Sequence, residues 1–360
     1  MSDNTLLDVR NLTVAYRSAV KSIKALDNVS LTVGRSEIIA IVGESGSGKS
    51  TLGLSIINLL QRPPAVVDAG QIVFNGQDLI KLSERELSAI RGTGVSMIFQ
   101  DPLSSLDPVY TVGQQISEAI DMREKRIASH NPGPFGREDP DLKPRAGGPG
   151  RVVWVRVPRS RRRSVYSQEV VEALKRVQIA DPERVIDRYP HELSGGMAQR
   201  VMIAQAMVQR PSLLIADEPT SALDVTTQAQ VLRLMREMRR DLGSSILIVT
   251  HDLAVAAQVA DRVLVMYAGE VVELSDVARV FEKPLHPYTE GLLKSIPRKY
   301  RDEGRLEAIP GDVPDLRFLP SGCRFHPRCK YAFDRCRAEH PELIKAEPGR
   351  EVACFLRYPA

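Results

Sequence analysis

A glycine-rich run near the N-terminus has the residue types and spacing that bind phosphate. The run is Gly43-Glu44-Ser45-Gly46-Ser47-Gly48-Lys49-Ser50, which fits G-x-x-x-x-G-K-[ST]. It follows an apolar segment at 38–42 and precedes a predicted helix. Glycines let the backbone N–H groups wrap around phosphate oxygens, lysine neutralises those oxygens, and serine can ligate Mg²⁺. The pattern predicts a nucleotide site, and this setting disfavours an ordinary Gly-Ser turn.

Two carboxylates and a histidine are predicted to reach the same edge of a sheet. Asp217 and Glu218 end the apolar run that begins at Leu213, and His251 follows a second apolar run at 246–250. The carboxyl ends of parallel strands share one edge, where ligands bind. We expect Asp217 to hold Mg²⁺ and Glu218 to polarise the water that attacks the γ-phosphate. Either feature alone is explained as well by an acidic turn or by a histidine near a helix N-cap.

A second predicted anion site lies further along the chain. Leu193-Ser194-Gly195-Gly196-Met197 opens a predicted helix that runs to Gln209, and a helix N-terminus attracts negative charge. One nucleotide does not require two phosphate sites. We therefore expect this turn to close over the ATP that another subunit holds.

The sequence LSGGM resembles the ABC signature, and the order of motifs over about residues 5 to 275 resembles an ABC nucleotide-binding domain. The resemblance implies that Tyr16 stacks on adenine and that Gln100 is the Q-loop residue, touching Mg²⁺ and the membrane partner. It also makes His251 the switch histidine. Tyr16 could instead be an ordinary strand aromatic, and Gln100 a solvated turn residue. Ala198 departs from the longer polar residue of many relatives, with little expected effect.

The implied site combines these motifs. Glu218, His251 and Lys49 are the expected catalytic residues, and Ser50, Gln100 and Asp217 the expected Mg²⁺ ligands. The ATP-binding set is Tyr16, Gly43, Glu44, Ser45, Gly46, Ser47, Gly48, Lys49, Ser50, Thr51, Gln100 and Asp217. The resemblance assigns the D-loop to Ser221, Ala222, Leu223 and Asp224. Such domains form a head-to-tail dimer that closes on two ATP molecules and separates after hydrolysis.

All four cysteines lie in the last 38 residues. They are Cys323, Cys329, Cys336 and Cys354, with the spacing C-x5-C-x6-C-x17-C. A reducing cytoplasm argues against disulfides and favours a metal, either tetrahedral Zn²⁺ or an iron–sulfur cluster. The spacing matches neither a C-x2-C zinc ribbon nor a ferredoxin run. His326 and His340 are expected to be surface residues rather than ligands.

The tail resembles the C-terminal domain of the oligopeptide and dipeptide importer ATPases. The resemblance rests on HPYTEGLLKSIP, AIPGDVPDL and CRFHPRCKYAFDRC. It implies a [4Fe-4S] cluster on the four cysteines, with zinc or free thiols as alternatives. It also implies a second ATPase subunit, expected to be a homologous, distinct chain with a second copy of this chain as the alternative, together with two transmembrane permease subunits and an extracytoplasmic peptide-binding protein.

Composition limits the other possibilities. Hydrophobic residues are 43% and charged residues 26%, and no stretch approaches the roughly 20 apolar residues of a membrane helix. The N-terminus lacks a secretory signal, so we expect the cytoplasmic face of the membrane. Residues 123 to 163 hold twelve Lys or Arg against four acids, a surplus of eight. The net charge of +4 therefore leaves the rest of the chain slightly acidic, and no nucleic-acid partner is expected.

The periodicities predict an α/β fold. Strands are expected at 6–16, 28–33, 37–42, 71–75, 95–99, 213–216 and 246–249, and helices at 50–60, 111–121, 168–178, 195–209 and 225–241. With the resemblance, this is a P-loop ABC nucleotide-binding domain over 1–284, made of an antiparallel β subdomain, a parallel-sheet core and a helical subdomain at about 101–210. A small Cys-containing extension covers 285–360.

A Pro-, Gly- and Arg-rich stretch interrupts the helical subdomain. We predict a flexible insertion at 123–166, because five Pro and five Gly fall within 131–150. A solvated tether is favoured, with anionic lipid or nucleic acid as alternatives; Trp154 and Tyr166 are its only Trp and Tyr.

Two alternative functions stay open for the whole chain. One is a soluble ABC ATPase acting on DNA or ribosomes, and the other is the same motor importing nickel chelates.

Overall fold

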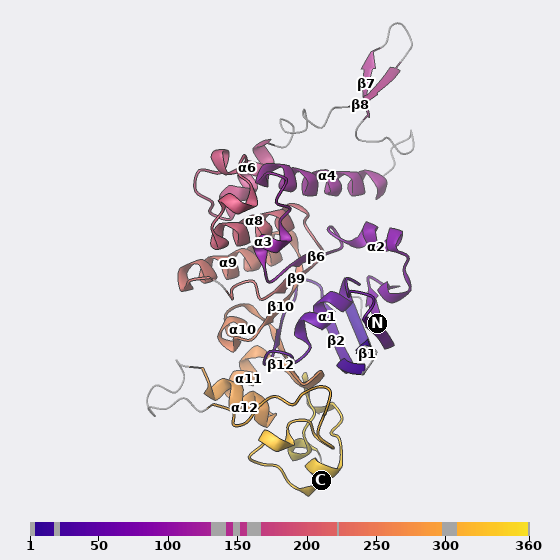
Figure 1. Ribbon diagram of the computed structural model, residues 1–360, viewed down its shortest axis with the longest axis vertical. Coiled ribbons are helices and arrows are strands. Elements are labelled where there is room, and N and C mark those ends of the chain that lie inside the picture. Colours follow the sequence, from indigo (N-terminus) through magenta and orange to yellow (C-terminus); the bar gives the residue numbers. More distant parts are fainter. Residues whose placement is uncertain are drawn as a thin grey trace. The chain divides into compact units, whose positions relative to one another are not determined.

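A computed structural model describes residues 4–17, 22–130, 142–146, 152–156, 167–221, 223–296 and 308–358. The chain divides into two compact units (Figure 1). The first comprises Met1–Leu87, Ile215–Pro219 and Met235–Ala360, and the second comprises Ser88–Leu214 and Thr220–Leu234.

The first unit opens with an antiparallel sheet in the order β2-β1-β4-β5. Its strands are β1 (Thr5–Arg17), β2 (Ser22–Gly34), β4 (Ala65–Phe74) and β5 (Gln77–Asp78). Leu26, Val29, Leu31 and Val33 of β2 are all buried, and the polar residues between them are more exposed. This alternation is typical of a sheet with one face on the core. The predicted β-rich opening is confirmed.

The main sheet of the first unit has the order β13-β14-β12-β11-β3-β10-β9. Its strands are β3 (Ile38–Val42), β9 (Leu213–Asp217), β10 (Ser245–Thr250), β11 (Arg262–Tyr267), β12 (Glu270–Asp276), β13 (Ile344–Glu347) and β14 (Arg350–Val352). Strand β3 pairs in parallel with β10 and with β11. Every residue of β3, β9 and β10 is buried, which explains the apolar runs at 38–42, 213–216 and 246–249.

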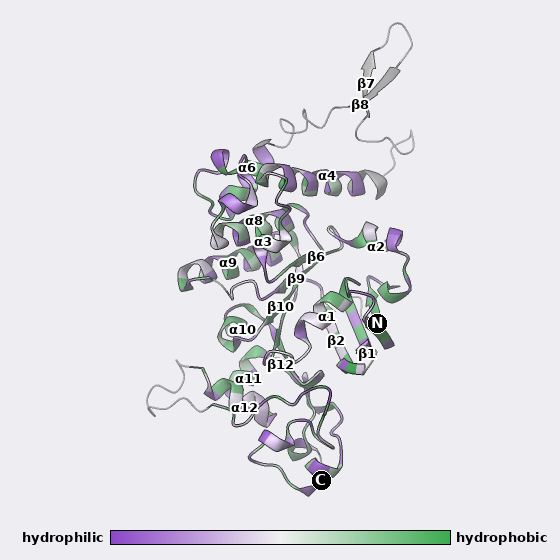
Figure 2. Cartoon of the chain, viewed as in Figure 1, coloured by the Kyte–Doolittle hydropathy of each residue, from purple (hydrophilic) through white to green (hydrophobic). Residues whose placement is uncertain are grey.

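Helices and short turns complete the first unit. They are α1 (Lys49–Ile56), η1 (Leu79–Lys81), the start of α2 (Glu84–Ile90), the end of α9 (Val225–Leu242), α10 (Leu253–Val259), α11 (Val277–Glu282) and α12 (Pro287–Lys294). Figure 2 colours α10 as hydrophobic, and Leu253, Val255, Ala256 and Val259 of this helix are buried. Helix α1 starts directly at the end of the phosphate-loop motif, as predicted.

The C-terminal extension joins the main sheet instead of standing apart. It contains α12, η4 (His326–Arg328), α13 (Asp334–Ala338), β13, β14 and η5 (Phe355–Arg357). Strand β14 pairs antiparallel with β12. The predicted boundary at residue 285 therefore does not separate two compact units, because hydrogen bonds of one sheet continue across it.

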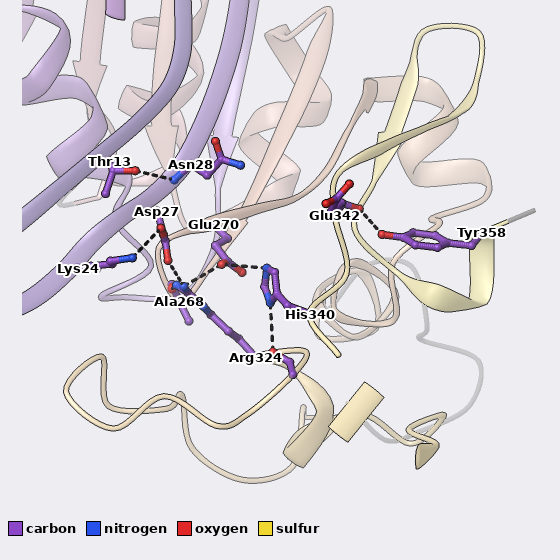
Figure 3. A network of polar contacts seen from close by, with 11 residues as sticks. Thr13, Lys24, Asp27, Asn28, Ala268, Glu270, Arg324, His340, Glu342 and Tyr358 are labelled. Atoms are coloured by element: carbon purple, nitrogen blue, oxygen red, sulfur yellow. Dashed lines mark hydrogen bonds and ion pairs between the residues drawn. The ribbon is translucent and has the colours of Figure 1, made fainter. Parts of the chain in front are cut away.

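Polar contacts also hold the extension to the start of the chain. Figure 3 shows Arg324 between Asp27 and Glu270, with the Arg324 guanidinium also donating to the Ala268 carbonyl oxygen. His340 reaches Glu270 at 3.2 Å in the same network. Tyr267, Tyr288 and Phe325 are distant in sequence but form a buried ring cluster, with ring centroids 4.6–5.4 Å apart.

The second unit is mainly helical. It contains β6 (Val95–Ile98), α3 (Pro102–Ser105), α4 (Val112–His130), α6 (Ser167–Arg176), α7 (Pro182–Val185), η2 (Pro190–Glu192), α8 (Gly195–Val208) and the start of α9. Figure 2 shows hydrophobic and hydrophilic colours alternating along α4. Among the residues described, no helix of either unit is long and apolar enough to cross a membrane.

The structure revises the start of the predicted flexible insertion. Helix α4 continues to His130, past the expected boundary at 123, and Arg123 is buried within it and donates to Glu169 and to the Val208 carbonyl oxygen. Within the insertion, β7 (Leu142–Ala146) and β8 (Val152–Arg156) form an antiparallel pair. The remainder, at 131–141, 147–151 and 157–166, lies outside the described residues.

Candidate functional site

The phosphate loop connects β3 to α1 in the first unit. Gly48 lies in the left-handed region at φ 100°, and a Cβ there would be 2.6 Å from the Ala25 carbonyl oxygen. Only glycine fits this position without displacing the backbone of β2. At Gly46 the φ angle is 79°, and no described atom lies within 4 Å of the place a Cβ would take. The loop is therefore tight against the sheet at one glycine and open at another.

Lys49 closes the loop upon itself. Its Nζ donates to the carbonyl oxygens of Gly43 at 2.8 Å and Glu44 at 2.9 Å. Burial lowers the pKa of Lys49, and the carboxylates of Glu218, Asp217 and Glu44 act in the opposite direction. A buried ammonium group surrounded by carboxylates and carbonyl oxygens is well placed to exchange these partners for phosphate oxygens.

Asp217 and Ser50 form an oxygen pair beside the lysine. The Ser50 hydroxyl donates to the Asp217 carboxylate at 3.1 Å, and Asp217 is only 6% exposed. Burial raises the pKa of Asp217, and the Ser50 hydrogen bond opposes that rise. A buried carboxylate next to a hydroxyl is a donor set that suits Mg²⁺, and a cation would favour its ionised form.

Glu218 and His251 lie at the same edge of the main sheet. His251 Nδ1 is 3.2 Å from Glu218 Oε1, and the Glu218 N–H donates to the Val249 carbonyl oxygen at 2.9 Å. Each residue follows directly after a buried strand, β9 or β10. The sequence prediction that both strand ends bring their side chains together is confirmed for this pair.

The loop residues fit Mg²⁺-ATP in their chemistry. The Ser47 hydroxyl oxygen is buried and has no hydrogen-bond partner within the described part of the chain. Gly46 leaves open space, Lys49 supplies positive charge, and Ser50 with Asp217 supplies oxygen ligands. When bound, Mg²⁺ neutralises charge on the phosphates. Tyr16 is partly exposed near the end of β1, beside residues 18–21 that are outside the described residues.

The signature turn, Gln100 and the D-loop belong to the second unit. Ser194 is the N-cap of α8 and accepts from the Met197 N–H at 3.4 Å, while Ser194 and Gly195 are exposed. A long helix with an exposed, glycine-bearing N-terminus suits an anion, as predicted. Of the D-loop, Ser221, Leu223 and Asp224 are described and Ala222 is not. Asp224 caps α9, where its carboxylate accepts from the N–H groups of Thr226 and Thr227 at 3.0 Å each.

The four cysteines line one small cavity. Cys323, Cys329, Cys336 and Cys354 surround it together with aromatic and proline side chains of the extension. Burial raises the pKa of Cys323 to about 12 and that of Cys354 to about 11, so both are neutral thiols at neutral pH. A metal cation would lower these values.

The four thiols around the cavity have the type and number of donors that a metal centre needs, but their spacing does not suit one. Its volume is about 10 Å³, and no three Cys, His, Asp or Glu side chains in the described ranges are grouped as ligands of one ion. His326 Nδ1 and His340 Nδ1 lie 2.9 and 3.1 Å from backbone carbonyl oxygens.

Two residues that contact the phosphate loop were not predicted from the sequence. The Tyr288 hydroxyl accepts from the Glu44 N–H at 2.8 Å, and Arg328 forms an ion pair with the Glu44 carboxylate at 2.7 Å. Both belong to segments that carry the peptide-importer resemblance, HPYTEGLL and CRFHPRC. Nothing in their local pattern indicates a contact with residue 44, because the fold alone brings these distant positions together.

Comparison with known proteins identifies the class. The family model described as ABC transporter matches residues 26–221, more than half of the chain. The chain belongs to the ABC transporter family, and it is an ATPase subunit for which ATP and Mg²⁺ are the expected ligands. A second family model, described as the oligopeptide/dipeptide transporter C-terminal region, matches residues 272–336.

Individual relatives are similar over almost the whole length. The dipeptide transport ATP-binding protein DppD of Escherichia coli is 43% identical, covering 97% of this chain and 96% of its own. The oligopeptide transport ATP-binding protein AppD of Bacillus subtilis is also 43% identical, covering 98% and 97%. Among solved structures, the dimeric ATP-binding cassette MJ0796 bound to ADP and Pi has a TM-score of 0.59 at 26% identity, covering 76% of this chain and 99% of that one.

Proposed function

We propose that this chain hydrolyses ATP to power the import of dipeptides or oligopeptides through separate permease subunits. The observation that carries the proposal is the extension. A match to the oligopeptide/dipeptide C-terminal region follows the ABC transporter match in one chain, and relatives similar over almost the whole length are named for dipeptide and oligopeptide transport.

The roles of the site residues form part of this proposal. Lys49 and the loop 43–51 bind the ATP phosphates, and Ser50, Asp217 and Gln100 hold Mg²⁺. Glu218 accepts the proton of the attacking water, and His251 positions Glu218 and the γ-phosphate. Support comes from the 3.2 Å contact between His251 and Glu218 and from the buried Ser47 hydroxyl, which has no hydrogen-bond partner among the described residues.

The proposal includes the assembly in which the motor works. This chain and a homologous chain form a dimer that closes on ATP. The signature turn of each chain, residues 193–197 in this one, faces the phosphate loop of the other. The similar ATP-binding cassette MJ0796, whose structure is dimeric, supports this arrangement. Two permease subunits and an extracytoplasmic binding protein complete the importer, and the chain lies on the cytoplasmic face of the membrane.

The four cysteines are proposed to hold a [4Fe-4S] cluster, with Zn²⁺ as the alternative. Their gathering around one cavity supports the proposal, and insertion of a cluster would require the thiols to move outward from it. Iron and sulfide analysis with a visible spectrum of anaerobically purified protein tests it. A colourless protein that contains zinc would contradict the cluster.

Transport in proteoliposomes tests the proposed function. The chain is reconstituted into proteoliposomes with the permease and ATPase subunits encoded beside its gene. The binding protein is added outside the vesicles, together with a labelled dipeptide, a labelled pentapeptide or a nickel chelate. We expect ATP-dependent uptake of peptide, and no uptake when Glu218→Gln replaces the wild type. Uptake of the nickel chelate alone would favour the alternative cargo.

A further inference from the structure

Glu44 of the phosphate loop is held on three sides. Its carbonyl oxygen accepts from Lys49 Nζ, and its N–H donates to the Tyr288 hydroxyl at 2.8 Å. Its carboxylate accepts from both terminal nitrogens of Arg328, at 2.7 and 3.0 Å. The second and third contacts come from the C-terminal extension, 244 and 284 positions further along the chain.

Burial and contacts other than the ion pair with Glu44 fix the Arg328 side chain. Its side chain is only 5% exposed, and its Nε donates to the Pro310 carbonyl oxygen at 3.0 Å. The guanidinium also lies 5.8 Å from the centre of the Tyr267 ring. A forked pair made by a pre-oriented arginine is stronger and more directional than a lysine contact. The extension therefore presents a rigid positive group to the loop.

A carboxylate at position 44 disfavours the binding of phosphate by this loop. Glu44 adds negative charge where phosphates must bind, and it interacts with the same Lys49 that the phosphates require. Like charges at short range destabilise binding, more strongly where water is excluded. Pairing with Arg328 neutralises the carboxylate, while the Tyr288 hydroxyl fixes the backbone of the same residue.

We propose that Arg328 and Tyr288 are positioning residues for the ATP site, through which the C-terminal extension sets the affinity of the phosphate loop for nucleotide. Arg328 cancels the charge of Glu44, and Tyr288 holds its peptide group. The inference rests on the proposed assignment of residues 43–51 as the ATP phosphate loop. Neither residue touches the Glu218–His251 pair in the contacts described, so the effect is on nucleotide binding and not on hydrolysis.

A double-mutant cycle on the full chain tests the charge argument. Equilibrium binding of a non-hydrolysable ATP analogue with Mg²⁺ is measured for Arg328→Gln, Glu44→Gln and the double variant. We expect Arg328→Gln to weaken binding about fivefold at low salt, because one charge is left unscreened. In the Glu44→Gln background, which has no carboxylate for Arg328 to neutralise, the same Arg328→Gln change should weaken binding by less than about twofold.

Two further readouts separate charge from general damage. The loss in Arg328→Gln should shrink in about 0.5 M salt, which screens charges beyond a few ångströms. In steady-state ATPase assays, KM for ATP should rise about fivefold while kcat stays within about twofold. Arg328→Lys keeps the charge and should restore most of the affinity, and Tyr288→Phe should weaken binding about twofold. These last two variants test the inference even if Arg328→Gln does not fold.

The controls make the outcomes distinct. Arg335→Gln changes another arginine of the extension, whose partner is Glu339 at 2.8 Å, and should leave nucleotide affinity unchanged. If Lys49→Ala retains affinity, the assignment of the phosphate loop itself is wrong. If Lys49→Ala loses affinity but Arg328→Gln does not, only the inference is overturned. Equal weakening in Arg328→Gln and in the double variant would also overturn it.

Discussion

Glu218 occupies a backbone conformation that residues with side chains rarely adopt. Its φ is 45°, in the left-handed region, which costs about 1–3 kcal/mol unless the surroundings impose it. Here the N–H is bonded to Val249 and the carboxylate meets His251. The conformation directs the Glu218 side chain differently from that of Asp217, so two adjacent carboxylates can have different roles.

Replacing Glu218 by glutamine should separate binding from turnover. The amide keeps the size of the side chain but cannot accept a proton, so ATP binding should persist while hydrolysis falls at least about a hundredfold. Equilibrium nucleotide binding and phosphate release measure the two steps. Glu172→Gln, an exposed change on α6, is the control and should keep full activity. Full turnover in Glu218→Gln would remove Glu218 as the base.

Sequence analysis anticipated the residues whose motifs are local. The phosphate loop, Asp217, Glu218 and His251 each occupy the end of a buried strand, and strand ends can be located from apolar runs. Tyr288 and Arg328 were missed because their partner, Glu44, is distant in sequence. The pairing of β14 with β12, the ring cluster around Phe325 and the ion pairs of the extension all link these distant segments to the core that carries the loop.

At the scale of elements, the junction of β3 and α1 is the most constrained part of the site. Its two inner glycines differ sharply in their surroundings, since Gly48 packs against β2 and Gly46 faces open space. The sequence motif has glycine at both positions and does not indicate which one tolerates a side chain. Their surroundings in the structure distinguish them.

The change Gly48→Ala should be much more damaging than Gly46→Ala. Both residues have positive φ, which costs alanine about 1 kcal/mol, but the added methyl at Gly48 also meets the Ala25 carbonyl oxygen at 2.6 Å. We expect Gly48→Ala to lower the free energy of unfolding by about 2–3 kcal/mol or more, and Gly46→Ala by about 1 kcal/mol. Denaturant unfolding without nucleotide measures both, and equal losses would contradict the packing argument.

The helical subdomain was predicted less completely than the strands. Helix α4 was expected to end near residue 121, yet it reaches His130, and Arg123 beyond the expected end is buried and bonds to Glu169 and Val208. A buried arginine looks like a surface residue in a periodicity count. Composition alone therefore placed the start of the insertion too early.

Across the first unit, the C-terminal extension is docked largely through charge. Arg324, Arg328 and Arg350 are each less than 10% exposed and pair with acids of the preceding core. The network in Figure 3 also contains His340, whose ring bonds to the Glu270 carboxylate and to the Gly322 carbonyl oxygen.

This docking should depend on pH through His340. The hydrogen bond to Glu270 raises the pKa of His340 above its ordinary value, although partial burial and, to a smaller extent, the nearby Arg324 oppose the rise. A raised folded-state pKa stabilises the protein below about pH 6.5, and that stabilisation is lost as pH rises through the folded-state pKa. Because His340 is half exposed, the contribution is only about 0.5 kcal/mol.

Thermal unfolding compares His340→Gln with the wild type at two pH values. The wild type should melt about 1–2 °C higher than the variant at pH 6, and the difference should nearly vanish at pH 9. His191→Gln, a change at an exposed histidine of the second unit, should show no such trend. An equal difference at both pH values would contradict a role for the charged imidazolium.

The distance in sequence between Glu44 and Arg328 also sets an order of events during synthesis. The 284 positions between them take roughly 14 to 57 seconds to translate at about 5–20 residues per second. During that interval the loop has emerged without the arginine that neutralises it. Under the proposal above, a chain that ends before residue 328 should bind nucleotide about fivefold more weakly than one that includes Arg328.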